Sequence, residues 1–279
     1  MTVAAILRFL LPWEFDPLLV SIELLLALAY ARGAAGAERG FWRPFSFWLS
    51  LLLTHLALQS HWDYYAQHMF FIHRAQHLVL HHVAPAALAL ANPWPVLYSG
   101  APAPARRLID VISRNAALVA VYDLLQQPVL AGTLFVATID VWLLPSVHFA
   151  AMLNPTLYAV MNWSMLLDGI LFWWLILDPR PKPPARVSYG IRILVLIVIV
   201  LPQILVGAII VFAKHDLFPV YDLCGRVFGL SALTDQQIGG VIIWDHASTM
   251  SVIACIIVLS RYRRQGRSDL AHRVALQGR

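Results

Sequence analysis

The chain has 279 residues, of which 60% are apolar and only 13% are charged, and its mean hydropathy is +0.70. Soluble domains carry about 25% charged residues, so a water-soluble fold would leave too much apolar surface exposed. The composition therefore excludes an ordinary soluble domain and indicates a polytopic membrane protein. The net charge of +5 is then a signal of membrane topology, and we expect no nucleic-acid partner.

Seven apolar segments are long enough to cross the hydrocarbon layer, which takes about 20 residues of helix. They cover 17–32, 44–60, 68–91, 128–148, 157–178, 189–213 and 237–260. Residues 106–127 mix apolar with charged side chains and predict one amphipathic helix on the membrane surface. Clustered prolines predict extended loops after the third and fifth spans. The sequence therefore predicts an all-α fold, with residues 1–279 forming a single helical domain in the membrane.

The basic residues fall on alternate loops. Sixteen of the 20 Lys and Arg residues lie in the C-terminal tail or at the loops after the first, third and fifth spans. Only Arg8, Lys214 and Arg226 lie on the other side of the predicted topology. Because cytoplasmic loops carry an excess of Lys and Arg, we predict that the N-terminus is outside and the C-terminus is cytoplasmic.

Histidines are concentrated in the third predicted span. The segment His68–His82 carries five imidazoles and the guanidinium of Arg74 among apolar residues. Ionisable groups inside hydrocarbon are costly and tend to be kept for function, and imidazole is the most common protein ligand for transition metals. His73, His77 and His81 are spaced i, i+4 and i+8, which places them along one helix face. The pattern predicts a metal or cofactor site. The alternative is that the rings only hydrogen-bond neighbouring helices.

The predicted orientation selects the ligands. Eight of the 11 histidines fall in the outer half of the membrane or at its outer surface, namely His55, His61, His68, His73, His77, His148, His215 and His246. Our candidate metal ligands are His73, His77, His55, His246, His68 and His148, with the thioethers of Met161 and Met165. Imidazole combined with thioether suits Cu(I), although methionine is also an ordinary core residue. His81 and His82, near or past the midplane, are expected to have structural or entry-path roles.

Arg74 should not face lipid unpaired. Glu23, Asp140 and Asp245 lie at a similar depth on three other spans, and we predict that at least one of them pairs with Arg74. Asp168 is a weaker candidate. Such a pair either fixes the registry of the helices, orients the ligating imidazoles or compensates an anionic group on a cofactor.

Several motifs resemble those of a known family. The segment His73-Arg74-Ala75-Gln76-His77, followed by Val83-Ala84-Pro85, is similar to the His-x-x-Gln-His…Ala-Pro signature of the CtaG-type cytochrome c oxidase assembly factors. Further matches follow in the same order at Trp142–Pro145, Phe172–Trp174, Leu201–Gln203 and Asp235–Gly240. The resemblance covers nearly the whole chain. It implies a multi-pass protein of the bacterial cytoplasmic membrane that helps to mature haem–copper oxidases, through copper supply on the outer side.

The resemblance carries over most directly to His73, Gln76 and His77, and it makes Arg74 and Gln76 candidate cofactor-binding residues. The chain also departs from the family pattern. Leu143 stands where many relatives have histidine. The fifth span offers Met161, Asn162, Met165 and Asp168 in place of a histidine-rich motif. We expect His148 and the methionines to compensate.

Four functions stay open. The leading one is a non-enzymatic assembly factor that binds copper and supplies it to cytochrome c oxidase subunits, with a periplasmic copper chaperone as a further partner. Metal affinity should then fall as the histidines protonate below about pH 6.5. The second is a haem protein with bis-histidine ligation and Arg74 near a propionate. The third is an intramembrane zinc hydrolase with Asp245 or Asp140 as general base. The fourth is a scaffold whose histidines are structural.

Overall fold

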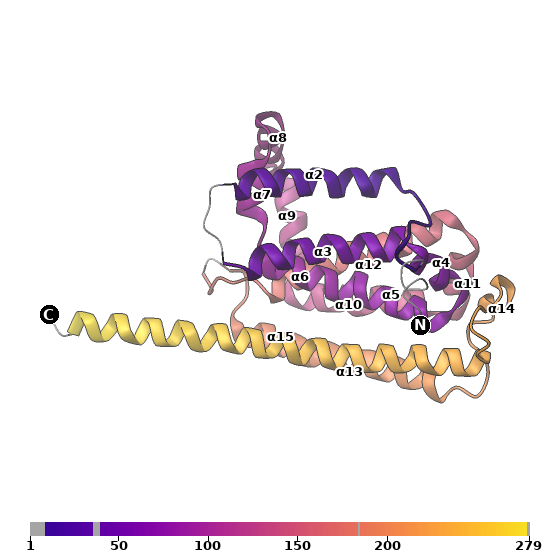
Figure 1. Cartoon of the computed structure of the whole chain (residues 1–279). Helices are drawn as coiled ribbons and strands as arrows, with labels where there is room; N and C mark the ends of the chain where they lie inside the picture. The colour runs from indigo at the N-terminus through magenta and orange to yellow at the C-terminus, as the bar shows by residue number, and fades with distance from the viewer. Residues whose placement is uncertain (1–8, 36–39, 184, 278–279) are drawn as a thin grey trace.

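The computed structural model describes residues 9–35, 40–183 and 185–277, and these ranges contain helices and no β-strand. The all-α prediction is confirmed. The helices are α2 (Pro17–Ala34), α3 (Trp42–Gln59), α4 (His61–His68), α5 (Phe70–Leu78), η1 (Val79–Val83), α6 (Ala84–Ala91), α7 (Trp94–Gly100), α8 (Ala103–Arg114), α9 (Ala116–Leu125), α10 (Pro128–Leu143), α11 (Pro145–Leu153), α12 (Pro155–Ile176), α13 (Tyr189–Phe212), α14 (Val220–Cys224) and α15 (Ala232–Gln277). The long helices run side by side, with α4, α11 and α14 at one end of the bundle and α8 at the other (Figure 1).

The chain is a multi-pass membrane protein. Four helices are individually long and apolar enough to cross a membrane, namely α2, α12, α13 and α15. The pair α9 and α10, which is bent by 71°, adds a fifth candidate if both helices belong to one broken span. Four predicted spans, 17–32, 157–178, 189–213 and 237–260, coincide with these four helices. The predicted spans 44–60 and 68–91 coincide with α3 and with the continuous helix formed by α5, η1 and α6.

Two predicted boundaries are wrong. The span 128–148 ends at Leu143, because Leu144 is extended (ψ 122°) before Pro145 starts α11, as expected for a residue that precedes proline. The surface helix 106–127 is two helices, α8 and α9. Asn115 is extended between them, and its side chain caps α9 by accepting hydrogen bonds from the backbone N–H groups of Ala117 and Leu118.

The third predicted span contains a π-helical turn, η1, flanked by the α-helices α5 and α6. Pro85 has no N–H to donate to the carbonyl of His81, four residues earlier. The indole Nε1 of Trp173 donates to that carbonyl instead, over 3.1 Å. Gly169 lets α12 come this close, because a Cβ there would lie 2.5 Å from the same oxygen. The turn leaves the adjacent residues His81 and His82 both buried.

Different short helices lie at the two ends of the helix bundle. At one end, called the α4 end, lie α4, α11 and α14, and Tyr221 of α14 bonds to His148 of α11. At the other, the α8 end, Arg186 pairs with Asp123 of α9. Figure 1 shows the 46-residue helix α15 extending beyond the bundle at the α8 end. It is about 69 Å long, more than twice the thickness of a hydrocarbon layer.

Arg8, one of the three basic residues predicted on the outer side, lies outside the described residues.

Candidate functional site

Two histidines of α5 form the centre of the site. The Nε2 atoms of His73 and His77 lie 2.9 Å apart, and both side chains are buried. Their spacing of four residues places them one turn apart on the same helix face, as predicted. His77 Nε2 also lies 3.2 Å from the amide oxygen of Asn162 on α12. Asn162 therefore connects α12, the fifth predicted span, to the pair.

His148 of α11 is the third imidazole of this group. Its ring centroid lies 5.2 Å from that of His73. Its Nδ1 lies 3.1 Å from the carbonyl oxygen of Trp142, which can only accept, so Nδ1 carries the proton. Its Nε2 then accepts from the Tyr221 hydroxyl at 2.9 Å. The helix ends before Leu144, and the change of direction there turns α11 back over the bundle. This brings His148 next to His73 of α5. We call His73, His77 and His148 the histidine cluster.

A polar network lies beside the histidine cluster at the α4 end. The carboxylate of Asp63 accepts hydrogen bonds from Gln76 Nε2 at 2.7 Å, from the Tyr158 hydroxyl at 2.8 Å and from Gln67 Nε2 at 2.7 Å. Burial raises the pKa of Asp63 to about 6, against these hydrogen bonds, which lower it. The Tyr158 ring lies 5.9 Å from that of His73. The Gln76 amide is thus engaged with Asp63 and with the Ala57 carbonyl.

The sequence did not single out Asp63, Tyr158 or Tyr221. Asp63 is the one acid of the polar segment His61–His68, and an acid at the end of an apolar helix is a signal that could have been used. The two tyrosines carry no such signal, because tyrosine is common in membrane helices near the interface.

A second group of histidines surrounds a small cavity deeper in the bundle. The cavity is lined by Arg74, His77, Leu78, His81, His82, Ile139, Met165, Ile243 and His246. The ring centroids of His82 and His246 lie 4.5 Å apart, between η1 and α15. His81 Nε2 lies 3.2 Å from the Asp168 carboxylate. His77 belongs to both groups and connects the histidine cluster to this cavity.

The predicted ion pair of Arg74 is wrong. Among the described residues Arg74 has no ion pair, and its buried Nε and Nη2 atoms have no hydrogen-bond partner. Glu23 instead contacts His55, with Oε2 and Nδ1 2.8 Å apart. Asp140 lines an apolar groove between α10 and α13, and Asp245 is exposed on α15. Equal depth does not fix the direction in which a helix presents its side chain, and these three acids face elsewhere.

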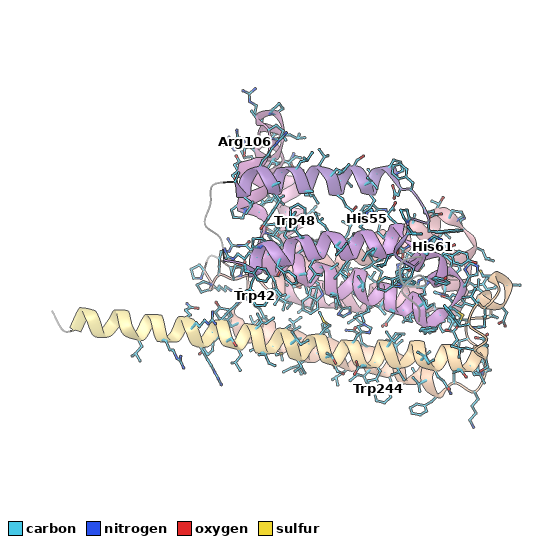
Figure 2. All side chains as sticks on the ribbon, viewed as in Figure 1. Trp42, Trp48, His55, His61, Arg106 and Trp244 are labelled. Atoms are coloured by element: carbon cyan, nitrogen blue, oxygen red, sulfur yellow. The ribbon has the colours of Figure 1, made fainter. Side chains whose placement is uncertain are left out.

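The other predicted ligands are dispersed. His55 lies on the side of α3 that faces α2 (Figure 2), and 43% of its side chain is exposed. His68 contacts the backbone carbonyl of Tyr64 through Nδ1, over 2.7 Å. His246 and Met165 line the cavity, and Met161 is fully buried one turn before Met165. The structure therefore brings together His73, His77 and His148, and separately His246 and Met165, but not His55 or His68.

Few potential metal ligands converge on any one point of the described structure. Within the described residues, no three or more His, Cys, Asp or Glu side chains are arranged to hold one metal ion. Two imidazole nitrogens of the described residues lie within hydrogen-bond distance of each other in the His73–His77 pair. A pair of neutral imidazoles can serve a metal of low coordination number, whereas structural zinc takes four ligands and catalytic zinc takes three and a water.

These features define a class: a multi-pass helical membrane protein with buried histidines at one end of its bundle. The family model of the cytochrome c oxidase caa3 assembly factors matches residues 25–265. The chain therefore belongs to this family, which places it as a multi-pass protein of the bacterial cytoplasmic membrane.

The curated relatives are mycobacterial. The chain is 27% identical over 282 residues to an uncharacterized protein of Mycobacterium bovis, covering 94% of this chain and 41% of that protein. An uncharacterized protein of Mycobacterium leprae is 26% identical over 294 residues, covering 98% of this chain and 42% of its own length. The chain thus spans about two fifths of the length of these relatives. No solved structure matches it.

Proposed function

We propose that this chain is the copper-handling component of oxidase assembly. In this proposal His73 and His77, with His148 beside them, bind one Cu(I) ion, and the chain passes it to a cytochrome c oxidase subunit. The observation that carries the proposal is that the two Nε2 atoms face each other in a buried site. They lie 2.9 Å apart, a hydrogen-bond distance, and a Cu(I) ion bound between them would move the rings farther apart. No catalytic step is involved, and a periplasmic copper chaperone is the expected donor.

The donor set favours Cu(I) over the alternatives. Buried neutral imidazoles are borderline-soft ligands, and two of them satisfy Cu(I), which accepts two-coordination. Zinc chemistry needs three or four ligands. A haem between His82 and His246 needs a flat space for the macrocycle, whereas the cavity beside them has a volume of about 10 Å³, enough for one water-sized sphere.

The proposed topology has seven spans, with the α4 end outside and the C-terminus in the cytoplasm. The 18 residues of α3 and the continuous helix from Phe70 to Ala91 are about 27 Å and 33 Å long, close to the hydrocarbon thickness. Figure 1 shows both running alongside the other long helices. The basic loops at the α8 end support a cytoplasmic position for that end. The histidine cluster then lies near the outer surface, where an oxidase receives copper.

The test is a Cu(I) competition titration of the purified full chain. Wild-type protein is expected to bind one Cu(I) per chain, and His73→Ala and His77→Ala to weaken binding at least tenfold. His55→Ala is the matched control, because His55 lies on α3 away from the cluster, and it should bind like the wild type. A wild-type chain that takes up no Cu(I), or His73→Ala and His77→Ala chains that bind as tightly as wild type, would overturn the proposal.

A further inference from the structure

The deeper cavity contains a positive charge without a counter-charge. Arg74 is buried on α5 with 2% of its surface exposed, and a guanidinium stays protonated in proteins. Its Nε and Nη2 atoms have no partner in the described part of the chain. The Cζ atom lies 5.2 Å from the centroid of the Phe70 ring, a contact that offsets only part of the cost of burying a charge.

Two carboxylates on the neighbouring helices are already engaged, and Asp140 of α10 faces the apolar groove toward α13. Asp235 of α15 accepts hydrogen bonds from the backbone N–H groups of Phe70 and Phe71, at 3.0 and 2.8 Å, and pairs with Arg226. Asp168 of α12 contacts His81. No ion pair joins Arg74 to any acid within the described residues. Within the described residues no negative charge compensates Arg74, and a bound anion would supply one.

The cavity beside Arg74 is small and has donors for such a group, and its lining would have to shift slightly outward to hold an ion larger than water. Its volume is about 10 Å³, room for a single water-sized particle. Both ring nitrogens of His82 lack a partner among the described residues, and a neutral imidazole always carries one N–H. Arg74 and His82 thus offer unpaired donors at one small cavity, whose remaining walls include the apolar side chains of Leu78, Ile139 and Ile243.

We propose that this cavity binds one small monovalent anion, a halide such as chloride, held by the Arg74 guanidinium and an N–H of His82. Water would accept the same hydrogen bonds but would leave the charge of Arg74 uncompensated in a low-dielectric interior. The inference goes beyond copper handling, and it is tested on copper-free protein, so that either idea can fail without the other.

The experiment is equilibrium dialysis of the purified, copper-free full chain against radioactive chloride in a gluconate buffer. Wild-type protein is expected to bind about one chloride per chain, with bromide competing and the larger sulfate not competing. Arg74→Gln should weaken binding at least tenfold, and His82→Phe should weaken it measurably. Arg180→Gln is the control for net charge, because Arg180 pairs with Asp178 on the surface, and it should bind like the wild type.

Three results would overturn the inference: a wild-type chain that binds no chloride, an Arg74→Gln chain that binds as much as wild type, or sulfate competing as well as bromide. If the Arg74→Gln chain does not fold, the competition of bromide and sulfate on the wild-type chain and the chloride binding of the His82→Phe chain still test the inference. Chloride binding that sulfate does not displace and that His82→Phe weakens supports the site.

Discussion

The two nitrogens of His148 have different tasks. Nδ1 donates to the carbonyl of Trp142, and this bond fixes the orientation and tautomer of the ring. Nε2, the atom with a free electron pair, accepts from the Tyr221 hydroxyl. Metal-binding histidines in proteins are commonly held by such a bond from the second ring nitrogen. In the proposed copper site Nε2 of His148 would be the ligand atom, and its bond to Tyr221 would have to open.

Asp63 gives a prediction on pH dependence. Burial raises the pKa of its carboxyl from 3.8 to about 6, so the folded chain binds this proton more tightly than the unfolded chain. The stability contributed by protonated Asp63 is complete below about pH 4 and is lost as the pH rises through 6. We expect this carboxyl to lower the free energy of unfolding by about 3 kcal/mol between pH 4 and 7.

The measurement is the melting temperature of wild-type and Asp63→Asn chains over that pH range. The amide in the Asp63→Asn chain is neutral throughout, so its profile should lack the fall that the carboxyl causes. The difference between the two profiles is the quantity to compare, because it removes the contributions that both chains share. Superimposable profiles would show that the carboxyl of Asp63 does not titrate as described.

At the scale of elements, the crossing of α13 and α15 depends on glycine. A Cβ at Gly207 of α13 would lie 2.9 Å from the carbonyl oxygen of Gly240 on α15, and close helix contacts in membranes are built on small residues. We expect Gly207→Ala to push the helices apart and to lower the melting temperature, at a cost of about 1–3 kcal/mol. Gly190→Ala on the same helix is the control, since a Cβ there meets nothing within 4 Å. An equal effect of both substitutions would refute the close contact.

The helices that consist of one long apolar run could be predicted from the sequence. The apolar runs at 17–32, 157–178 and 189–213 predicted α2, α12 and α13, because a long apolar run has no other stable conformation in a membrane. The break at Leu144 was also visible in principle, since Pro145 disfavours a helical residue before it. The predicted span 128–148 missed this break because the span was assigned from hydropathy alone, and the sequence remains apolar on both sides of Pro145.

The candidate site was predictable only in part. The i, i+4 spacing placed His73 and His77 together, since it depends on one helix alone. Whether an acid reaches Arg74 depends on how the helices rotate against one another, which spacing does not specify. The carbonyl of His81 in the π turn accepts a hydrogen bond from Trp173, 92 residues away, which no local pattern specifies. That is why His81 and His82, expected in secondary roles, line the cavity with His246.

At the scale of the whole molecule, the proposed topology predicts which residues are accessible from outside. Cysteines are introduced singly at Ser231, before α15, and at Ser113 on α8, after Cys224 and Cys255 are replaced by serine. Both positions are exposed. In intact cells a membrane-impermeant maleimide should label the cysteine at 231 and spare the one at 113. The proposed orientation would be contradicted if both cysteines were labelled only after lysis. It would also be contradicted if intact cells labelled the cysteine at 113 and spared the one at 231.

The central claim is that imidazoles at the α4 end hold copper for the oxidase. Copper K-edge X-ray absorption of the Cu(I)-loaded full chain tests it most directly, because it reports the ligand atoms. We predict a Cu(I) edge with two or three nitrogen ligands of imidazole type, which is lost in the His73→Ala, His77→Ala double variant. A shell dominated by sulfur, or a spectrum unchanged in the double variant, would contradict the claim.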